Sequence, residues 1–553
     1  MVRKTVMEIA PPKAHSIALF LARVGTQTRR REAVSFIGLA LFATLLAFTN
    51  LANFPRPWMD EGSIMTLARS VAEDGVYAVQ SAEGYQTFGA VQSVGPPVVL
   101  PIALVFKYFG LGLLQGRLVI GLYLVLAIML YYRLACRLMP TGFALLGTLL
   151  CLGSPGGPIL WHGRQALGDV PALTFFLAGM LCLTDAFETP RYWRFIIAGV
   201  LFGGAMVTKS QYIIFLAPTL GLLCLRDLFF QRQGLSRGLA LVGVISYSGA
   251  FLWTIWQYLY FGSEIFAENS MKLGELARAM IGFSPQMTPG AITYLVSPST
   301  NHFFFFWGVV ALPFALYRSR QASRSGVGLT FLSLFTVLWL GYFTLFMKLP
   351  WFVSSYAPMT FVPFFIGYLW AEIYALWRTL PRATPNGEAI ESQTALRATS
   401  IALITVMLGT TLYPLQQRTR EILVADDATR DVRQTAALLE QIVPPDAVVE
   451  TWERELGIFS RLRYHFPDQI YLAQTQAMAT GFAPAKPILG AEYFAHSNAT
   501  YLVISFYARH YHLYDLAYVR QHSCLVGVVG QDATSYEIFH LTAIAKSQCP
   551  PLN

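Results

Sequence analysis

Long apolar runs, separated by short polar segments, constrain this chain more than any other feature of its sequence. A helix needs about 20 mostly apolar residues to cross the hydrocarbon core of a bilayer. Hydrophobic residues make up 55% of the 553 residues and charged residues only 13%, which is too apolar for one soluble core. The sequence therefore predicts a polytopic α-helical membrane protein. Its 11 or so spans are expected near residues 34–53, 113–134, 142–160, 170–187, 195–208, 211–228, 238–261, 302–317, 327–347, 354–377 and 398–414.

The distribution of Lys and Arg predicts how the chain is oriented. Segment 1–33 carries Arg29, Arg30 and Arg31, and the loops assigned to its side hold more basic residues than the loops on the other side. Basic residues favour the cytoplasmic side of a membrane. We therefore expect a multi-pass protein of the cytoplasmic (inner) membrane of a bacterium, with a cytoplasmic N-terminus and an extracytoplasmic C-terminus. The net charge of +9 reflects this topology, and no nucleic acid is expected as a partner.

Three parts follow from this pattern: the cytoplasmic segment 1–33, a transmembrane domain over 34–415, and a soluble extracytoplasmic domain over 416–553. The last part is expected to be a small α/β domain. Its helix is predicted at 430–442 and its strands at 447–450, 501–505 and 535–539.

Two cysteines, Cys524 and Cys549, lie in this soluble region and flank a predicted hairpin. They could form a disulfide in an oxidising compartment, and the sequence alone leaves that open.

The outer loop 54–112 opens with the stretch 56–63, Arg-Pro-Trp-Met-Asp-Glu-Gly-Ser, directly after the first span. Apolar residues then recur at helical spacing as far as Gly75, which predicts a helix lying in the membrane interface. A second apolar segment, 96–110, is too short to cross the membrane, so it is expected to be re-entrant or interfacial. The acidic pair of the stretch 56–63, Asp60 and Glu61, must lie at the membrane surface and not in the lipid.

This organisation resembles the C-type glycosyltransferase superfamily. Within it, the chain is most similar to the dolichyl-phosphate-mannose protein mannosyltransferase branch and its bacterial relatives, which include the aminoarabinose transferases of lipid A. The motifs that carry the resemblance are Asp60-Glu61-Gly62, Gly75, Pro96-Pro97, Gly110, Arg117, Arg164, Asp169-Val170-Pro171, Gly203-Gly204 and Thr208-Lys209.

The resemblance implies that a hexosyl or pentosyl group moves from a polyprenyl-phosphate carrier to a lipid, glycan or protein acceptor at the outer membrane face, with inversion. A separate argument also favours a sugar donor that is held in the membrane. No nucleotide-sugar pool exists outside the cytoplasm, and the sequence has neither a P-loop nor a Rossmann fingerprint. The alternative is a transporter or flippase of lipid-linked substrates, although the paired broken helices of transporters are not visible in the sequence.

Asp60 is the predicted general base, because a poorly hydrated carboxylate has a raised pKa that suits proton abstraction from a hydroxyl. It could instead cap the interfacial helix. Glu61 is a predicted substrate-binding residue; it could also complement the helix dipole or bind a divalent metal. The sequence requires no cofactor, and metal dependence stays open.

Cations at the depth of Asp60 should stabilise the phosphate that leaves the sugar. Arg117, Arg164 and Lys209 lie at the outer ends of spans and are the predicted phosphate ligands. Each could instead be a snorkelling residue at a helix end. Asp169 is predicted either to bind substrate or to cap the fourth span.

Overall fold

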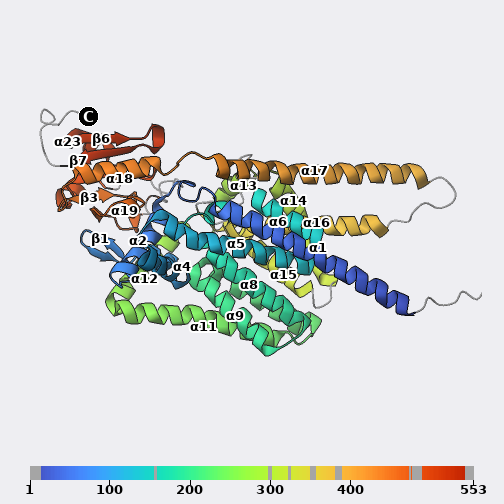
Figure 1. Cartoon of the computed structure of the whole chain (residues 1–553). Helices are drawn as coiled ribbons and strands as arrows, with labels where there is room; N and C mark the ends of the chain where they lie inside the picture. Colours follow the sequence, from blue (N-terminus) through green and yellow to red (C-terminus); the bar gives the residue numbers. More distant parts are fainter. Residues whose placement is uncertain are drawn as a thin grey trace, which may run out of the picture.

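The computed structural model describes residues 14–154, 159–296, 302–321, 326–348, 356–379, 389–471, 475 and 489–541. A bundle of long helices forms most of the molecule, and a small sheet domain lies at one end of it (Figure 1). The long helices are α1 (Ala14–Phe48), α5 (Leu113–Leu138), α6 (Thr141–Gly153), α8 (Asp169–Glu188), α9 (Tyr192–Thr208), α10 (Gln211–Arg226), α11 (Ser236–Phe261), α14 (His302–Gln321), α15 (Gly326–Leu345), α16 (Tyr356–Thr379) and α17 (Ala389–Val424).

Every predicted span falls on one of these helices. Among the described residues, seven helical segments are long and apolar enough to cross a membrane, in α1, α5, α8, α10, α11, α15 and α16. The chain is therefore a multi-pass membrane protein. The full count of 11 spans and the side on which each terminus lies remain predictions.

The burial pattern of α1 shows why a continuous apolar run is needed in this environment. Ile37, Leu41 and Leu45 form one stripe at a spacing of four residues and are exposed, whereas Ala43 and Leu46 are buried against the bundle. A helix that is apolar on both faces packs one face on protein and leaves the other for lipid.

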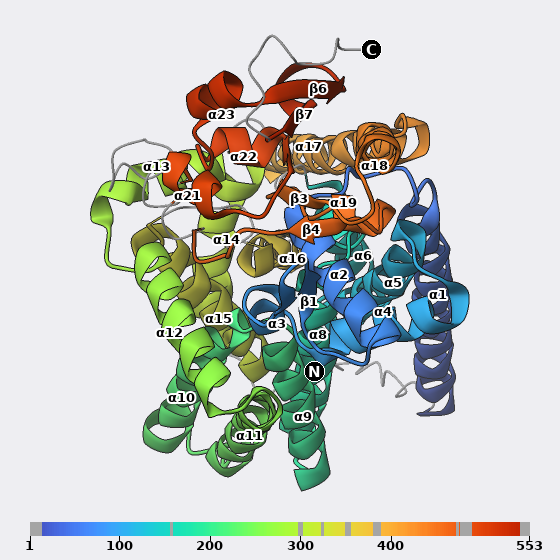
Figure 2. The ribbon, with the colours of Figure 1, turned by 90° about the vertical axis from the view of Figure 1, so that its left-hand side faces the viewer.

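An outer layer connects α1 to α5. It contains α2 (Met59–Glu73), the hairpin β1 (Val79–Ser81) and β2 (Gly84–Gln86), α3 (Ala90–Ser93) and α4 (Pro96–Phe109). Gly75 has a φ of +71° just after α2, a conformation that glycine adopts without strain. The predicted interfacial helix and the short apolar segment thus correspond to α2 and α4, which pack on each other (Figure 2).

The C-terminal domain has the predicted α/β character. Helix α18 (Arg430–Ile442) accompanies a five-stranded sheet of order β4-β3-β5-β7-β6. Strand β3 runs parallel to β4 and β5, and β7 runs antiparallel to β5 and β6. The strands are β3 (Val448–Thr451), β4 (Arg463–His465), β5 (Tyr501–Ile504), β6 (Cys524–Val529) and β7 (Tyr536–His540). Cys524 is disulfide-bonded; its expected partner Cys549 lies outside the described residues.

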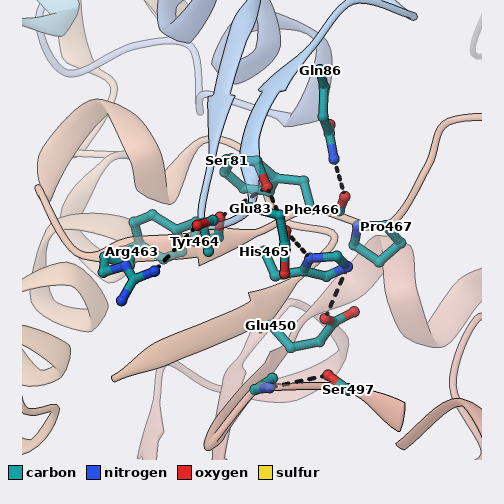
Figure 3. A network of polar contacts seen from close by, with 12 residues as sticks. Ser81, Glu83, Gln86, Glu450, Arg463, Tyr464, His465, Phe466, Pro467 and Ser497 are labelled. Atoms are coloured by element: carbon teal, nitrogen blue, oxygen red, sulfur yellow. Dashed lines mark hydrogen bonds and ion pairs between the residues drawn. The ribbon is translucent and has the colours of Figure 1, made fainter. Parts of the chain in front are cut away.

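The outer layer and the C-terminal domain pack tightly together. Buried residues of α2, such as Leu67, share one apolar cluster with Val449 and Leu456 of the C-terminal domain. The β1–β2 hairpin also docks on β4, where the Ala82 amide donates to the Tyr464 carbonyl at 2.7 Å. Figure 3 shows this contact region, in which Glu83 pairs with His465. The two parts therefore form a continuous structure on one side of the bundle.

The closest approach in this interface is at Gly62. A Cβ atom on Gly62 would lie 2.3 Å from the Glu455 nitrogen and 2.4 Å from the Arg454 carbonyl carbon. These are backbone atoms that cannot rotate away, so only glycine allows α2 to contact the segment after β3 this closely.

We predict that Gly62→Ala separates the two parts and destabilises the protein by about 1–3 kcal/mol, the usual range for overpacking. Thermal unfolding in detergent measures this loss. The matched control is Gly274→Ala in α12 (Ser263–Met280), where a Cβ atom meets nothing within 4 Å. Equal stability of the two variants would show that this contact is not needed.

Candidate active site

Asp60 lies in the first turn of α2, at the end of the bundle that faces the C-terminal domain. The N-cap of α2 is Trp58, and no side chain caps this helix. Asp60 is partly buried, and within the described residues its carboxylate takes part in no hydrogen bond or ion pair. The helix-capping alternative for Asp60 is therefore wrong.

The surroundings of Asp60 set its proton affinity. Burial raises the pKa of Asp60, since it disfavours the charged form; Lys209 opposes this rise, the nearby Asp169 adds to it, and Arg454 and His162 oppose it. The pKa of the carboxyl group therefore lies above its ordinary value, which makes the carboxylate a stronger base. It is also free of competing partners in the described structure.

Lys209 and Asp169, whose charges both act on Asp60, form an ion pair with each other. The Lys209 Nζ atom lies 3.3 Å from Oδ1 and 3.4 Å from Oδ2 of Asp169. Asp169 opens α8 but does not cap it, because Gly168 holds the N-cap position without a side-chain bond. Lys209 directly follows α9, and its side chain is 16% exposed. A partly accessible ammonium thus remains available for a second anion.

His162 completes this cluster at the end of α7 (Ile159–His162). Its Nδ1 atom lies 3.6 Å from Asp169 Oδ2, and its ring stacks on Tyr356 with centroids 5.1 Å apart. Four helices therefore bring charged or aromatic groups together next to Asp60.

Glu61 and Arg117 form a fully buried ion pair. Arg117 donates from Nε and Nη2 to the two carboxylate oxygens of Glu61, at 2.8 and 2.7 Å. The Ala166 amide adds a bond to Glu61 at 2.9 Å, and Arg117 also donates to the Leu51 carbonyl at 3.1 Å. Both charged groups are satisfied by protein atoms, so the pair ties α2, α5 and the segment before α8 together and thereby positions Asp60.

Arg164 is bound in a different way. Its guanidinium donates to the carbonyls of Leu46, Ala47 (3.3 Å), Thr49 (2.7 Å) and Phe54 (3.0 Å). These carbonyls lie at or just after the C-terminal end of α1, where helix carbonyls lack partners within the helix and attract cations. Arg164 therefore holds the turn that leads into α2.

The structure thus separates the six predicted site residues into two sets. Asp60, Asp169 and Lys209 lie together, and Asp60 and Lys209 are partly exposed whereas Asp169 is buried. Glu61, Arg117 and Arg164 are bound to protein atoms behind them, which differs from the predicted contact with substrate.

Charged residues that the sequence reasoning did not single out also reach this region. They come from the turn after β3, in the order Glu453, Arg454, Glu455, and all three are buried. Three consecutive charges two residues after a predicted strand were the available signal, because buried charges near a strand end need a specific reason.

A cavity of about 240 Å³ lies between the start of α2, α7 and the C-terminal domain. Its lining includes the aromatic rings of Trp58, Trp161, Phe506 and Tyr507 and the carboxyl groups of Glu453 and Glu455. Because Trp58 and His162 both line it, the cavity adjoins the Asp60 cluster. Apolar walls with a few fixed polar groups are typical of small-ligand sites.

The two glutamates of the cavity are held in different ways. Glu453 accepts from the Ser505 amide at 3.1 Å, and Glu455 accepts from the Tyr536 hydroxyl at 2.9 Å. Burial raises the pKa of both carboxyl groups, and the charge of Glu453 further raises the pKa of Glu455. The cavity can therefore offer both a hydrogen-bond donor and acceptors.

No cluster of three or more His, Cys, Asp or Glu side chains suited to a metal ion occurs in the part of the chain that the structure describes.

Comparison with known proteins supports the fold. A family profile described as dolichyl-phosphate-mannose-protein mannosyltransferase matches residues 94–257. ArnT from Cupriavidus metallidurans, crystallised with undecaprenyl phosphate, is similar over 94% of this chain and 99% of ArnT, with a TM-score of 0.57 and 15% identity. No protein of curated function matches the chain in sequence.

A second structure, the archaeal oligosaccharyltransferase AglB from Archaeoglobus fulgidus in complex with an inhibitory peptide and a dolichol-phosphate, is similar over 95% of this chain and 75% of AglB. The TM-score is 0.53 and the identity 12%. The protein has the fold of the C-type glycosyltransferase superfamily, which confirms the resemblance predicted from the sequence. The profile match covers less than half of the chain, and its description agrees with the resemblance found in the sequence.

We predict that Arg117→Met destabilises the protein by about 3–5 kcal/mol, because it leaves the Glu61 carboxylate buried without its counter-ion. The double variant Glu61→Met/Arg117→Met should recover much of that loss, since neither charge is then unpaired. Thermal unfolding of both variants measures the difference. A double variant no more stable than Arg117→Met would contradict the assigned structural role of the pair.

Proposed function

We propose that this protein is a membrane glycosyltransferase. It transfers a sugar from a polyprenyl-phosphate carrier to an acceptor hydroxyl at the outer face of the cytoplasmic membrane, with inversion at the anomeric carbon. The observation that carries this proposal is Asp60: a partly buried carboxylate with a raised pKa and, within the described residues, no hydrogen-bond or ion-pair partner, next to an ammonium group and beside a cavity.

The reaction that these groups support is a single displacement. Asp60 takes the proton from the acceptor hydroxyl as its oxygen attacks the anomeric carbon. The bond between that carbon and the phosphate oxygen breaks, and its electron pair leaves with the polyprenyl phosphate. Attack from the face opposite the leaving group inverts the configuration at that carbon.

Lys209 is the proposed ligand of the leaving phosphate. Its side chain is 16% exposed and is oriented by the ion pair with Asp169. The ammonium can therefore contact an incoming phosphate while it stays paired with Asp169. A fixed cation stabilises negative charge most where water is scarce. Glu61, Arg117 and Arg164 act behind the site and keep α2 in place.

The cavity lined by Glu453, Glu455 and Tyr507 is the proposed acceptor site. Aromatic rings and carboxyl groups together suit a ring that carries hydroxyl groups, because the rings contact its apolar face and the carboxyl groups bind its hydroxyls. The cavity joins both parts of the chain, so the C-terminal domain contributes to acceptor choice.

Similarity to proteins with lipid-phosphate ligands supports the donor class. ArnT was crystallised with undecaprenyl phosphate, and AglB was determined with a dolichol-phosphate. Transport of a lipid-linked substrate, the alternative considered above, would require polar groups at the middle depth of the bundle. The polar cluster of Asp60, Asp169 and Lys209 lies instead at the bundle end next to the C-terminal domain.

We predict that Asp60→Asn lowers sugar transfer by about 100- to 10,000-fold, the range of general-base catalysis, while donor binding remains. Release of polyprenyl phosphate from labelled polyprenyl-phosphate sugars in nanodiscs measures turnover. Asp74→Asn, at the other end of α2, is the control and should retain activity. Equal turnover by wild type and Asp60→Asn would remove the base from this account.

The pH dependence gives a separate test. The base must be deprotonated, so kcat/KM should fall as the pH decreases through the raised pKa of Asp60. Lys209 opposes that rise. Lys209→Met should therefore move the acidic limb of the kcat/KM profile to higher pH, in addition to lowering the rate. An acidic limb at the same pH in both proteins would contradict the assignment of that limb to Asp60.

A further inference from the structure

We propose that Arg454 of the C-terminal domain binds an oxyanion at the Asp60 site, with the phosphate of the carrier lipid as its ligand. This inference deepens the proposed function and rests on it. It adds a second cation, from a part of the chain distant in sequence, to the one that Lys209 supplies.

The backbone brings Arg454 to the start of α2. The position of a Cβ atom on Gly62 would be 2.5 Å from the Arg454 carbonyl oxygen, so the two segments are in direct contact. Arg454 and Asp60 are also near enough for the charge of each to shift the pKa of the other. The guanidinium therefore lies within electrostatic reach of Asp60, as well as of Asp468, whose charge acts on it more strongly.

The side chain of Arg454 is held at one end only. Its Nη2 atom donates to the Pro467 carbonyl at 3.1 Å and to Gln86 Oε1 at 3.3 Å, and the guanidinium lies over the Phe466 ring at 4.9 Å. Gln86, Phe466 and Pro467 lie together where the β1–β2 hairpin meets the segment after β4 (Figure 3). These contacts fix the orientation of the group.

Two other nitrogens of the guanidinium have no partner among the described residues. Nε and Nη1 are buried and lack a hydrogen bond to any residue that the structure describes. Arg454 also forms no ion pair with any described residue, although the residue is only 1% exposed. Burial accordingly lowers the pKa of Arg454 to about 10, because the charged form is poorly solvated.

The other fully buried arginines show how unusual this is. Arg117 directs three donor nitrogens to Glu61 and Leu51, and Arg164 uses both terminal nitrogens on carbonyls of the α1 turn. A buried guanidinium with two unused nitrogens is costly for folding alone. The unused Nε and Nη1 atoms lie on different edges of the guanidinium, so each can donate separately to an oxygen of a bound oxyanion, and such charge-assisted bonds are strong.

Arg454 is separate from the proposed acceptor cavity. Glu453 and Glu455 line the proposed acceptor cavity, whereas the residue between them does not. The guanidinium instead contacts Gln86 of the hairpin and the Pro467 carbonyl. Asp60 is thus within electrostatic reach of two cations, Lys209 and Arg454, from the two parts of the chain.

Binding of undecaprenyl phosphate to the full chain in nanodiscs tests the proposal, with undecaprenol and inorganic phosphate as comparison ligands. Arg454→Met and Arg454→Gln are compared with Arg461→Met, a control in the same domain whose side chain is 74% exposed. We expect both Arg454 variants to bind undecaprenyl phosphate at least tenfold more weakly, to bind undecaprenol as wild type does, and to unfold at a temperature no lower than wild type without ligand.

The outcomes separate the possible explanations. If wild type binds inorganic phosphate as tightly as the lipid and both variants lose it, the oxyanion site stands and its ligand is free phosphate. Unchanged affinity for undecaprenyl phosphate in the Arg454 variants overturns the proposal. A loss of folding in both variants also overturns it, because Arg454 would then have a structural role. Wild type that binds no polyprenyl phosphate would instead remove the proposed function.

Discussion

The buried ion pair between Glu61 and Arg117 is the interaction on which the rest of this site depends. It joins the first turn of α2 to α5, and its carboxylate also receives the amide of Ala166 before α8. Since both charges are satisfied only by each other and by fixed backbone groups, the start of α2 has one permitted position. Asp60, the residue that precedes Glu61, is positioned by this pair.

The second constraint is that the site is assembled from two parts of the chain. Helix α2 lies at the end of the helix bundle, and the turn after β3 contacts it at Gly62 with no room for a side chain. Burial of Asp60 in this region raises the pKa of its carboxyl group. A membrane enzyme with a lipid donor and a polar acceptor needs such a site, because the two substrates arrive from different solvents.

Much of the fold is predictable because the signals are local. Apolar runs marked the helices, and periodicity located α2, α18 and three of the strands. The site was only partly predictable. Asp60, Asp169 and Lys209 do lie together, but the partners of Arg117 and Arg164 depend on packing between distant segments. Arg454 was missed for the same reason: it lies almost four hundred residues after Asp60, and nothing local indicates that the two meet.

The central claim is that Asp60 and the cations beside it form the transfer site. A structure of the protein with a non-reactive analogue of a polyprenyl-phosphate sugar tests it most directly. The account predicts the phosphate at Lys209 and the anomeric carbon beside Asp60, whose carboxylate lies about 3 Å from the position of an attacking oxygen. A phosphate bound elsewhere, with Asp60 remote from the sugar, would contradict it.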